Sequence, residues 1–254
     1  MPSFWPLSLI AVSGLFGWLA PMPSIPADHD GLCRTESFGG AEYIVCRIDL
    51  ERHRLRLMAE DGNSQPYETF GKVAEALGPE GETLRLAINA GMYHEDRRAV
   101  GLAIQNGREI QSASTADGPG NFSMKPNGIL FVEDGRAQVM ETSAYLARDR
   151  SPELATQSGP MLLIDGERHP RFIDGSTSRY VRNGACATDD GRTVALVLSR
   201  RPVNFWDFAG FFRERLGCRD ALFFDGQVSS LYYADLGIDY RRDRLGPILA
   251  VTDR

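Results

Sequence analysis

Two segments in the first quarter of the chain place apolar residues at nearly every second position. They are residues 42–50 (EYIVCRIDL) and 54–60 (RLRLMAE). This is the period of a strand with one buried face, and the residues ERH between them predict a hairpin. Residues 84–89 (LRLAIN) predict a further strand. Residues 101–105 predict another, which the turn pair Asn106–Gly107 continues into a hairpin.

The middle of the chain repeats one pattern, an apolar run interrupted by a turn pair. Gly128–Met140 turns at Asp134–Gly135, Gly159–Pro170 turns at Asp165–Gly166, and Gly184–Ser199 follows the same pattern. Asp-Gly pairs favour tight turns because both residues tolerate a positive φ. The pattern predicts three hairpins, and the apolar run Ala221–Phe224 predicts a strand after them.

Two segments have helical spacing. Residues 66–77 (PYETFGKVAEAL) are followed by Gly78 and Pro79, which end a helix. Residues 204–216 (NFWDFAGFFRERL) begin with Asn204 as the N-cap and precede Gly217. The expected apolar face of this second helix is Phe205, Trp206, Phe208, Ala209, Phe212 and Leu216. The pattern as a whole predicts an α+β fold: mixed or antiparallel sheets built from hairpins, with two main packing helices, as one large sheet or two packed sheets.

The first residues differ in composition from the rest. No charged residue occurs from Phe4 to Ala20, and the apolar run there is short and interrupted by Gly and Pro. It predicts a secretory signal peptide over residues 1–27, cleaved near Ala27; the alternative is an uncleaved N-terminal anchor. Residues 28–254 are then one domain of an exported protein, periplasmic or secreted. No other segment is long and apolar enough to span a bilayer.

Four cysteines, an even number, follow this leader: Cys33, Cys46, Cys186 and Cys218. Four thiols allow three pairings. We favour Cys33–Cys46 and Cys186–Cys218, because the members of each pair are close in sequence. No two cysteines have C-x-x-C spacing, which argues against a zinc site or a redox motif. Four free buried thiols remain the alternative for a cytosolic protein.

The net charge of −6 and the pI of about 5.3 argue against a nucleic-acid partner. The chain contains no G-x-S-x-G, no P-loop and no G-x-G-x-x-G after a strand. Neither the composition nor these motifs indicate a cofactor or a metal.

Polar residues follow two of the apolar runs, Asp225 after LFF and Asn89 after LAI. Such positions lie at the rim of a sheet, where ligands bind, although both residue types also form ordinary turns. Arg182 precedes an apolar strand and is suited to clamp a phosphate, with Arg179 as a rival and a surface position as the alternative. His94 has the chemistry of an acid or base but fits an exposed loop better.

Seven motifs then occur in an order that resembles the phosphodiester glycosidase family: INAGMY, VGLAIQNG, FSMKPNGILF, TQSGPMLLIDG, SRYVRNGACATDDG, VNFWDFAGFF and ALFFDGQVSSLYY. The resemblance covers roughly residues 42–234. The family includes a lysosomal enzyme that removes N-acetylglucosamine from mannose-6-phosphate diesters, and many bacterial exported proteins. NGA after Arg182, and Gln227 and Val228 after Gly226, make the match closer to the bacterial branch.

The resemblance implies an α+β fold and hydrolysis of the bond between the anomeric carbon of a sugar and a phosphodiester oxygen, for example in N-acetylglucosamine-1-phosphodiesters. It implies that Asp225 acts at the anomeric centre and that Arg182 holds the phosphate. It also implies that the substrate-binding residues lie in one pocket; these are Asn89, Gly91, Asn127, Ser158, Gly159, Asn183, Gly226 and Ser229. A second carboxylate, where the reaction needs one, is Glu95 or Asp96.

Two other functions fit the same residues. The pocket of an envelope protein can bind a glycan without cleaving it. A serine-dependent phosphodiesterase can use Ser229 or Ser230 as its nucleophile. The expected partner is therefore a glycosyl phosphodiester or an envelope glycan.

Overall fold

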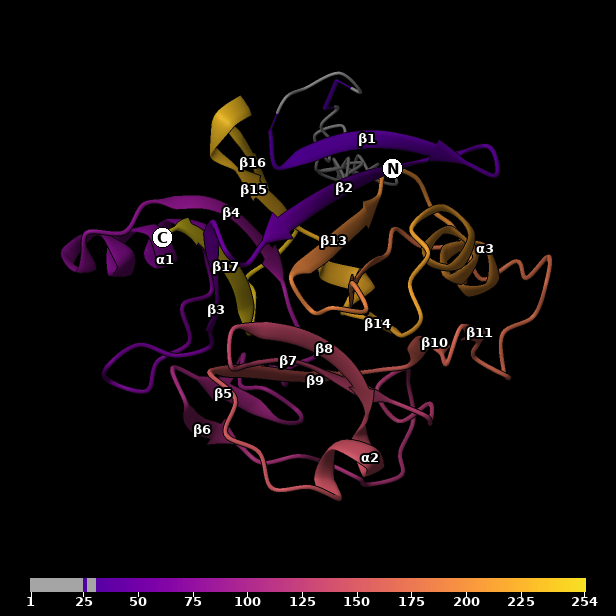
Figure 1. Ribbon diagram of the computed structural model, residues 1–254, viewed down its shortest axis with the longest axis horizontal. Helices are drawn as coiled ribbons and strands as arrows, with labels where there is room; N and C mark the ends of the chain where they lie inside the picture. Colours follow the sequence, from indigo (N-terminus) through magenta and orange to yellow (C-terminus); the bar gives the residue numbers. More distant parts are fainter. Residues whose placement is uncertain (1–24, 27–30) are drawn as a thin grey trace, which may run out of the picture.

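The computed structural model describes residues 25–26 and 31–254, and its strands form three sheets (Figure 1). The expected leader lies outside the described residues apart from residues 25–26. The first sheet has the order β1-β2-β13-β12-β14-β10-β11. Its strands are β1 (Cys33–Phe38), β2 (Ala41–Asp49), β10 (Met161–Ile164), β11 (Glu167–Arg168), β12 (Asn183–Ala187), β13 (Thr193–Ser199) and β14 (Ala221–Phe223).

The other two sheets have five strands each. The second sheet, in the order β16-β15-β4-β17-β3, contains β3 (His53–Met58), β4 (Leu84–Asn89), β15 (Leu231–Tyr233), β16 (Ile238–Tyr240) and β17 (Ile248–Asp253). The third, in the order β6-β5-β9-β7-β8, contains β5 (Ala103–Gln105), β6 (Arg108–Gln111), β7 (Gly128–Glu133), β8 (Arg136–Glu141) and β9 (Leu154–Ser158). Every pairing within these sheets is antiparallel.

The three sheets share one central core. Alternate residues of each strand enter it, such as Ile44 of β2, Leu86 of β4 and Leu130 of β7. The intervening residues, such as Val45 and Ala87, belong to separate clusters on the outer faces. Because many strands are buried on both faces, they appear in the sequence as continuous apolar runs rather than strict alternations.

One helix covers the outer face of each sheet. Helix α3 (Phe205–Gly210), which continues in wider π-type turns to Arg215, packs on the first sheet, α1 (Phe70–Leu77) on the second and α2 (Thr142–Leu146) on the third. The side chain of Asn204 caps α3 and accepts a hydrogen bond of 2.7 Å from the amide of Asp207. In the described residues, no helix has both the length and the apolar character needed to span a membrane.

The mostly antiparallel sheets and the few helices agree with the prediction from the sequence. The expected number of sheets is wrong, because the strands form three sheets rather than one large sheet or two packed sheets. The hairpins at Asn106–Gly107, Asp134–Gly135 and Asp165–Gly166 are confirmed, as is the pairing of β12 with β13. The expected hairpin over residues 42–60 is wrong. Both strands exist, but β2 already has β1 and β13 as neighbours, so β3 continues into the second sheet and pairs with β17.

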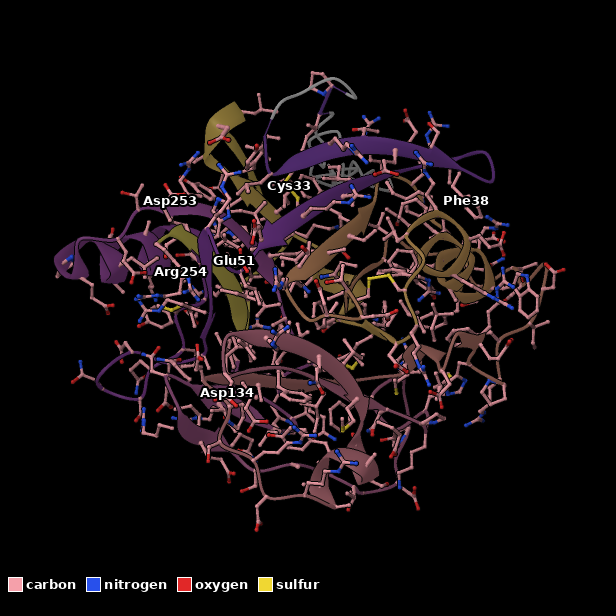
Figure 2. All side chains as sticks on the ribbon, in the orientation of Figure 1. Cys33, Phe38, Glu51, Asp134, Asp253 and Arg254 are labelled. Carbon is pink, nitrogen blue, oxygen red and sulfur yellow. A yellow bond between two sulfur atoms is a disulfide. The ribbon has the colours of Figure 1, made fainter. Side chains whose placement is uncertain are left out.

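Two disulfides join the pairs of cysteines that the sequence favoured. Cys33 and Cys46 lie opposite each other on β1 and β2, with their Cα atoms 3.9 Å apart (Figure 2). Cys186 of β12 is joined to Cys218, which follows α3, so the second disulfide ties that helix to its sheet. Disulfides of this kind are typical of proteins that fold in an oxidising compartment.

Each disulfide is expected to stabilise the fold mainly by restricting the unfolded chain. The two sequence separations are 32 and 13 residues. Loop-closure entropy then predicts losses of about 4 kcal/mol for Cys186→Ser/Cys218→Ser and about 3 kcal/mol for Cys33→Ser/Cys46→Ser. Urea unfolding of the oxidised proteins measures both values. This account would be contradicted if a reducing agent left the urea-unfolding midpoint of the wild type unchanged.

Candidate active site

A cavity of about 530 Å³ opens where β14 and the segment before β12 face two loops from other parts of the chain. Its wall contains one arginine, Arg182, and one acidic residue, Asp225. The remaining lining residues are mainly aromatic, glycine or small polar residues: Met92, Tyr93, Val100, Pro119, Gly120, Asn121, Phe122, Ser123, Ser178, Tyr180, Phe205, Phe223, Gly226 and Gln227.

The guanidinium of Arg182 is buried without an acidic partner. The residue is 2% exposed; its Nε donates to the carbonyl of Val203 at 2.9 Å and its Nη2 to the carbonyl of Ser178 at 3.2 Å. Its guanidinium carbon lies 3.5 Å from the ring centroid of Phe205. No carboxylate of the described residues forms an ion pair with it. Burial lowers the pKa of Arg182 to about 10, so the group remains charged at neutral pH and can bind an anion.

Asp225 follows β14 after one residue, Phe224, and caps the short 3₁₀ turn Gly226–Val228. Its carboxylate accepts one hydrogen bond, 3.1 Å long, from the amide of Gln227. Within residues 31–254 it forms no ion pair. Burial raises the pKa of this carboxyl above its ordinary value, because the apolar surroundings disfavour the charged form. The carboxylate is therefore costly to keep ionised and is available to a ligand.

Three buried side chains behind the cavity fix the position of Asp225. The Nδ2 of Asn89 donates to the carbonyl of Asp225 at 2.9 Å, and its Oδ1 accepts from Nδ2 of Asn183 at 3.0 Å and from the amide of Ser230 at 3.0 Å. The hydroxyl of Ser229 donates to the carbonyl of Gly226 at 3.0 Å. Asn89, Asn183 and Ser229 are thus brought together with Asp225, but none of the three lines the cavity.

A second group of expected site residues supports the loop that forms the opposite wall. Asn127 donates through Nδ2 to the carbonyl of Phe122 at 2.9 Å. A Cβ on Gly159 would approach that carbonyl to 2.7 Å, so the loop packs this closely only against glycine. Gly91 is similarly close to Gln157, and the buried hydroxyl of Ser158 has no partner in the described chain. These residues shape the wall from behind.

The aromatic wall of the cavity could not be foreseen from the sequence. Tyr93, Tyr180, Phe205 and Phe223 contribute to it, yet aromatic residues next to apolar runs look like ordinary core residues. Phe205 was expected on the apolar face of α3; it packs against the outer core of the first sheet from the first turn of that helix, and it also lines the cavity. The ring of Tyr93 is close enough to Asp225 for the carboxylate to contribute to its pKa, which burial raises to about 12.

Several candidates from the sequence lie elsewhere. His94, Glu95 and Asp96 are exposed, and none of them lines the cavity, so the structure places no second carboxylate from this loop in the wall. Arg179, the rival of Arg182, forms an ion pair with Asp207 at 3.3 Å and lines a different cavity.

Comparison with known proteins supports the resemblance seen in the motifs. The model of the phosphodiester glycosidase family matches residues 82–248. The uncharacterised protein YigE of Escherichia coli (strain K12) is 28% identical over 195 residues, 77% of this chain and 76% of that protein.

Two solved structures share the fold. One is the zebrafish N-acetylglucosamine-1-phosphodiester alpha-N-acetylglucosaminidase catalytic domain, auto-inhibited by its pro-peptide, with a TM-score of 0.61 at 13% identity over 91% of this chain and 87% of that chain. The other is a hypothetical protein from Synechocystis, with a TM-score of 0.53 at 13% identity over 87% of this chain and 61% of that chain.

Replacing Asp225 by Asn is expected to stabilise the fold at neutral pH. The folded protein binds the carboxyl proton more tightly than the unfolded chain does, so stability falls as pH rises from the ordinary pKa of 3.8 through the raised value. An Asn side chain can still accept the hydrogen bond from the amide of Gln227. Because it carries no charge, the loss of stability at neutral pH disappears. At pH 7 the melting temperature should rise, by roughly 2–4 °C for each kcal/mol regained.

Calorimetry over a range of pH values tests this expectation. The difference between Asp225→Asn and the wild type should disappear below pH 3.8, where both side chains are neutral. Asp149→Asn, at an exposed acid, is the matched control and should leave the melting temperature unchanged. An Asp225→Asn variant that is less stable than the wild type at pH 7 would show that the buried charge does not destabilise the fold.

Proposed function

Because the chain belongs to the phosphodiester glycosidase family, we propose that it hydrolyses the C1–O bond of a sugar joined through its anomeric carbon to a phosphodiester. The main support is the wall of the 530 Å³ cavity, where one arginine without an acidic partner and one carboxylate without an ion pair stand among aromatic rings. A glycosyl phosphodiester carries one negative charge on the phosphate and develops positive charge at C1, so it matches this pair of side chains.

Arg182 holds the phosphate in this proposal. The aromatic rings around its guanidinium and the two backbone carbonyls keep the side chain in place, and the Nη1 group has no partner in the described chain. A guanidinium that is already desolvated loses little hydration when an anion arrives. N-acetylglucosamine-1-phosphodiesters belong to the substrate class that this geometry fits.

Asp225 acts at the anomeric centre. Cleavage of a glycosidic bond passes through an oxocarbenium-like state, whose positive charge a nearby carboxylate stabilises. The same carboxylate can activate the attacking water. A phosphate leaving group departs without strong protonation, so this reaction needs no second carboxylic acid in the wall, in agreement with the exposed positions of Glu95 and Asp96.

The remaining family positions act as supports. Asn89, Asn183 and Ser229 hold the backbone around Asp225, while Asn127, Ser158 and Gly159 lie behind the opposite wall with Gly91. Gly226 lines the cavity, where a Cβ would meet the carbonyl of Val181 at 2.9 Å. The aromatic rings supply apolar surface for the faces of a sugar ring.

A serine-dependent phosphodiesterase finds less support. The hydroxyls of Ser229 and Ser230 are fully buried and donate to backbone carbonyls, at 3.0 and 2.6 Å. We place the activity, with its glycosyl phosphodiester or envelope glycan partner, in the periplasm or outside the cell, since two disulfides and a leader-like N-terminus favour export.

Asp225→Asn is expected to lower turnover at least about a hundredfold, because it removes the charge opposite C1. The wild type, Asp225→Asn and the control Asp149→Asn are incubated with a panel of sugar-1-phosphodiesters, including UDP-sugars, and the products are identified by mass spectrometry. Free sugar and an intact phosphomonoester are expected. Sugar-1-phosphate would indicate P–O cleavage instead, and binding without turnover on any member would favour the glycan-binding alternative.

Arg182→Lys is expected to raise KM about tenfold or more, because a lysine cannot reproduce the planar fork or its contacts with Phe205 and Val203. Arg148→Ala, at an exposed arginine away from the cavity, is the control. Steady-state kinetics on the best substrate of the panel measures both. An unchanged KM and kcat in Arg182→Lys would remove Arg182 from the proposed role.

The pH profile depends on the ionised form of Asp225. Because burial raises its pKa, kcat/KM should fall as pH decreases through that value, so the acidic limb should lie above the ordinary 3.8. Initial rates between about pH 3 and 8 measure this limb. Activity that increases as pH falls through the limb would mean that the protonated carboxyl is the active form.

A further inference from the structure

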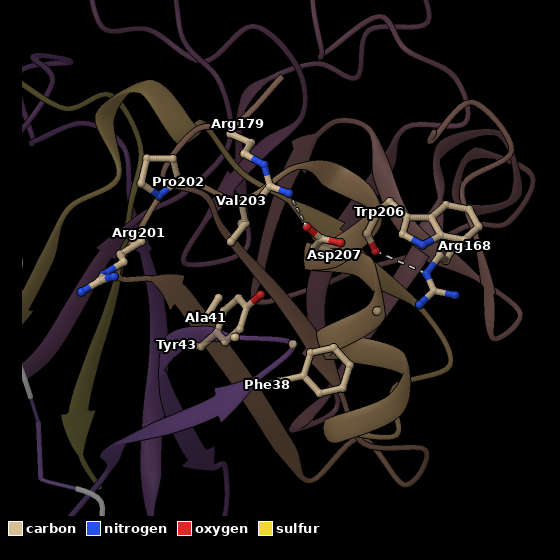
Figure 3. A pocket seen from close by; sticks show the side chains of 13 residues that line it. Phe38, Ala41, Tyr43, Arg168, Arg179, Arg201, Pro202, Val203, Trp206 and Asp207 are labelled. Carbon is tan, nitrogen blue, oxygen red and sulfur yellow. Dashed lines mark hydrogen bonds and ion pairs between the residues drawn. The ribbon is translucent and has the colours of Figure 1, made fainter. Parts of the chain in front are cut away.

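A second cavity, of about 220 Å³, lies beside α3 (Figure 3). It shares no lining residue with the first cavity, but the two have a wall between them. That wall is a pair of short segments joined at Tyr180 and Val203, whose backbones exchange hydrogen bonds of 3.1 and 2.8 Å. Tyr180 faces the first cavity and Val203 the second. The two cavities therefore lie on opposite sides of one thin layer of backbone.

The hydroxyl of Tyr43 is unpartnered and faces this second cavity. The residue is 1% exposed, and its ring is fixed by stacking on Phe211, with centroids 4.0 Å apart. In the described chain the hydroxyl forms no hydrogen bond, and Figure 3 shows it pointing toward the side where Asp207 lies. Because Tyr43 lines the cavity and its hydroxyl has no partner in the described chain, that hydroxyl can form a hydrogen bond with a ligand.

The charges around the cavity leave one cation uncompensated. Arg179 is paired with Asp207 at 3.3 Å, and Arg168 is paired with Glu214 at 2.5 Å. Arg201 stands at the rim, where its guanidinium extends outward and has no ion-pair partner among the described residues (Figure 3). The site therefore carries a local net charge of one positive unit in a protein whose net charge is negative.

The remaining polar and aromatic side chains of the second cavity are suited to bind the hydroxyl groups of a sugar. The carboxylate of Asp207 and the guanidinium of Arg179 are each about half exposed, so they can accept from and donate to two neighbouring hydroxyls. Trp206 contributes an indole to the wall. The volume lies below the range of roughly 300–1,000 Å³ that is usual for larger ligands, which favours a single ring.

We propose that this cavity binds one pyranose unit that carries a carboxylate, such as a uronic acid residue of a glycan. The ring hydroxyls meet the hydroxyl of Tyr43 and the Asp207–Arg179 pair, and the carboxylate meets Arg201 at the rim. The site is separate from the cleavage of the phosphodiester and does not rest on that function.

Trp206 provides a direct measurement. The sequence has three tryptophans, so Trp206 is the only one left in the full chain carrying Trp5→Phe and Trp18→Phe. Sodium glucuronate, titrated at constant ionic strength, is expected to change its emission in a saturable way. Glucose and sodium acetate, which supply the hydroxyls and the charge separately, are expected to give no saturable change. Equilibrium dialysis with radiolabelled glucuronate counts the bound ligand independently of the emission.

Two substitutions in this background test the assignment. Arg201→Ala should weaken glucuronate binding about tenfold or more, because it removes a charge-assisted hydrogen bond, and Tyr43→Phe should weaken it by roughly three- to tenfold, because it removes a neutral one. Tyr43→Phe keeps the stacked ring and removes an unpartnered hydroxyl, so its melting temperature should not fall. Asp225→Asn, in the other cavity, is the matched control and should bind glucuronate as the parent does.

Three outcomes would overturn the proposal. Dialysis without bound glucuronate would mean that the cavity is not a sugar-acid site. Equal binding of acetate would mean a simple anion site. Loss of binding in Asp225→Asn, with binding retained in Arg201→Ala, would place the ligand in the first cavity.

Discussion

The side-chain amides of Asn89 and Asn183 join the first two sheets at one point, and the first cavity depends on this junction. Asn89 ends β4 of the second sheet and Asn183 begins β12 of the first; their side chains meet at 3.0 Å. The remaining capacity of Asn89 is taken up by the backbone of Asp225 and Ser230. Because Asn89, Asn183 and Ser230 are buried, losing one partner would leave the others unsatisfied, so the junction holds a single geometry.

The two charged residues of this cavity are arranged differently from most of the charges in the protein. Many arginines elsewhere in the described chain form ion pairs: Glu36, for example, is bonded to Arg34, Arg47 and Arg215. Arg182 is as deeply buried as Glu36 but has only carbonyls and rings around it. A buried charge without a counter-charge opposes folding, and such positions are more often retained for binding than for stability.

The parts of the fold that depend on local chemistry could be predicted from the sequence. Turn pairs such as Asp134–Gly135 specify hairpins, and Asn204 specifies the start of α3, because both effects act within a few residues. The pairing of β2 could not be predicted in this way. Its partner β13 lies some 150 residues away, and local alternation carries no information on which distant strand will be the neighbour. The strand Ile248–Asp253 was missed for a different reason, since its apolar run after Gly246 and Pro247 is a local strand signal that the prediction did not use.

The candidate site, like the fold, could be predicted from the sequence only in part. The motif set brought Asn89, Asp225 and Arg182 into one region, which the structure agrees with. It could not separate residues that line the cavity from residues that hold the lining in place, since both kinds are polar and close together in the motifs. Nor could it distinguish Phe205, which faces a cavity, from Phe208, which is buried in the core of the same helix.

The position of β17 has a consequence for the order of folding. This strand lies between β3 and β4, whose residues come from positions 53–89 of the chain. The second sheet therefore cannot close until residues 248–253 have become available, and the contacts that close it span most of the chain. Folds with such long-range pairing form slowly. In the export that we propose, this delay is useful: the polypeptide can stay unfolded while it crosses a membrane, and complete its sheets and disulfides on the far side.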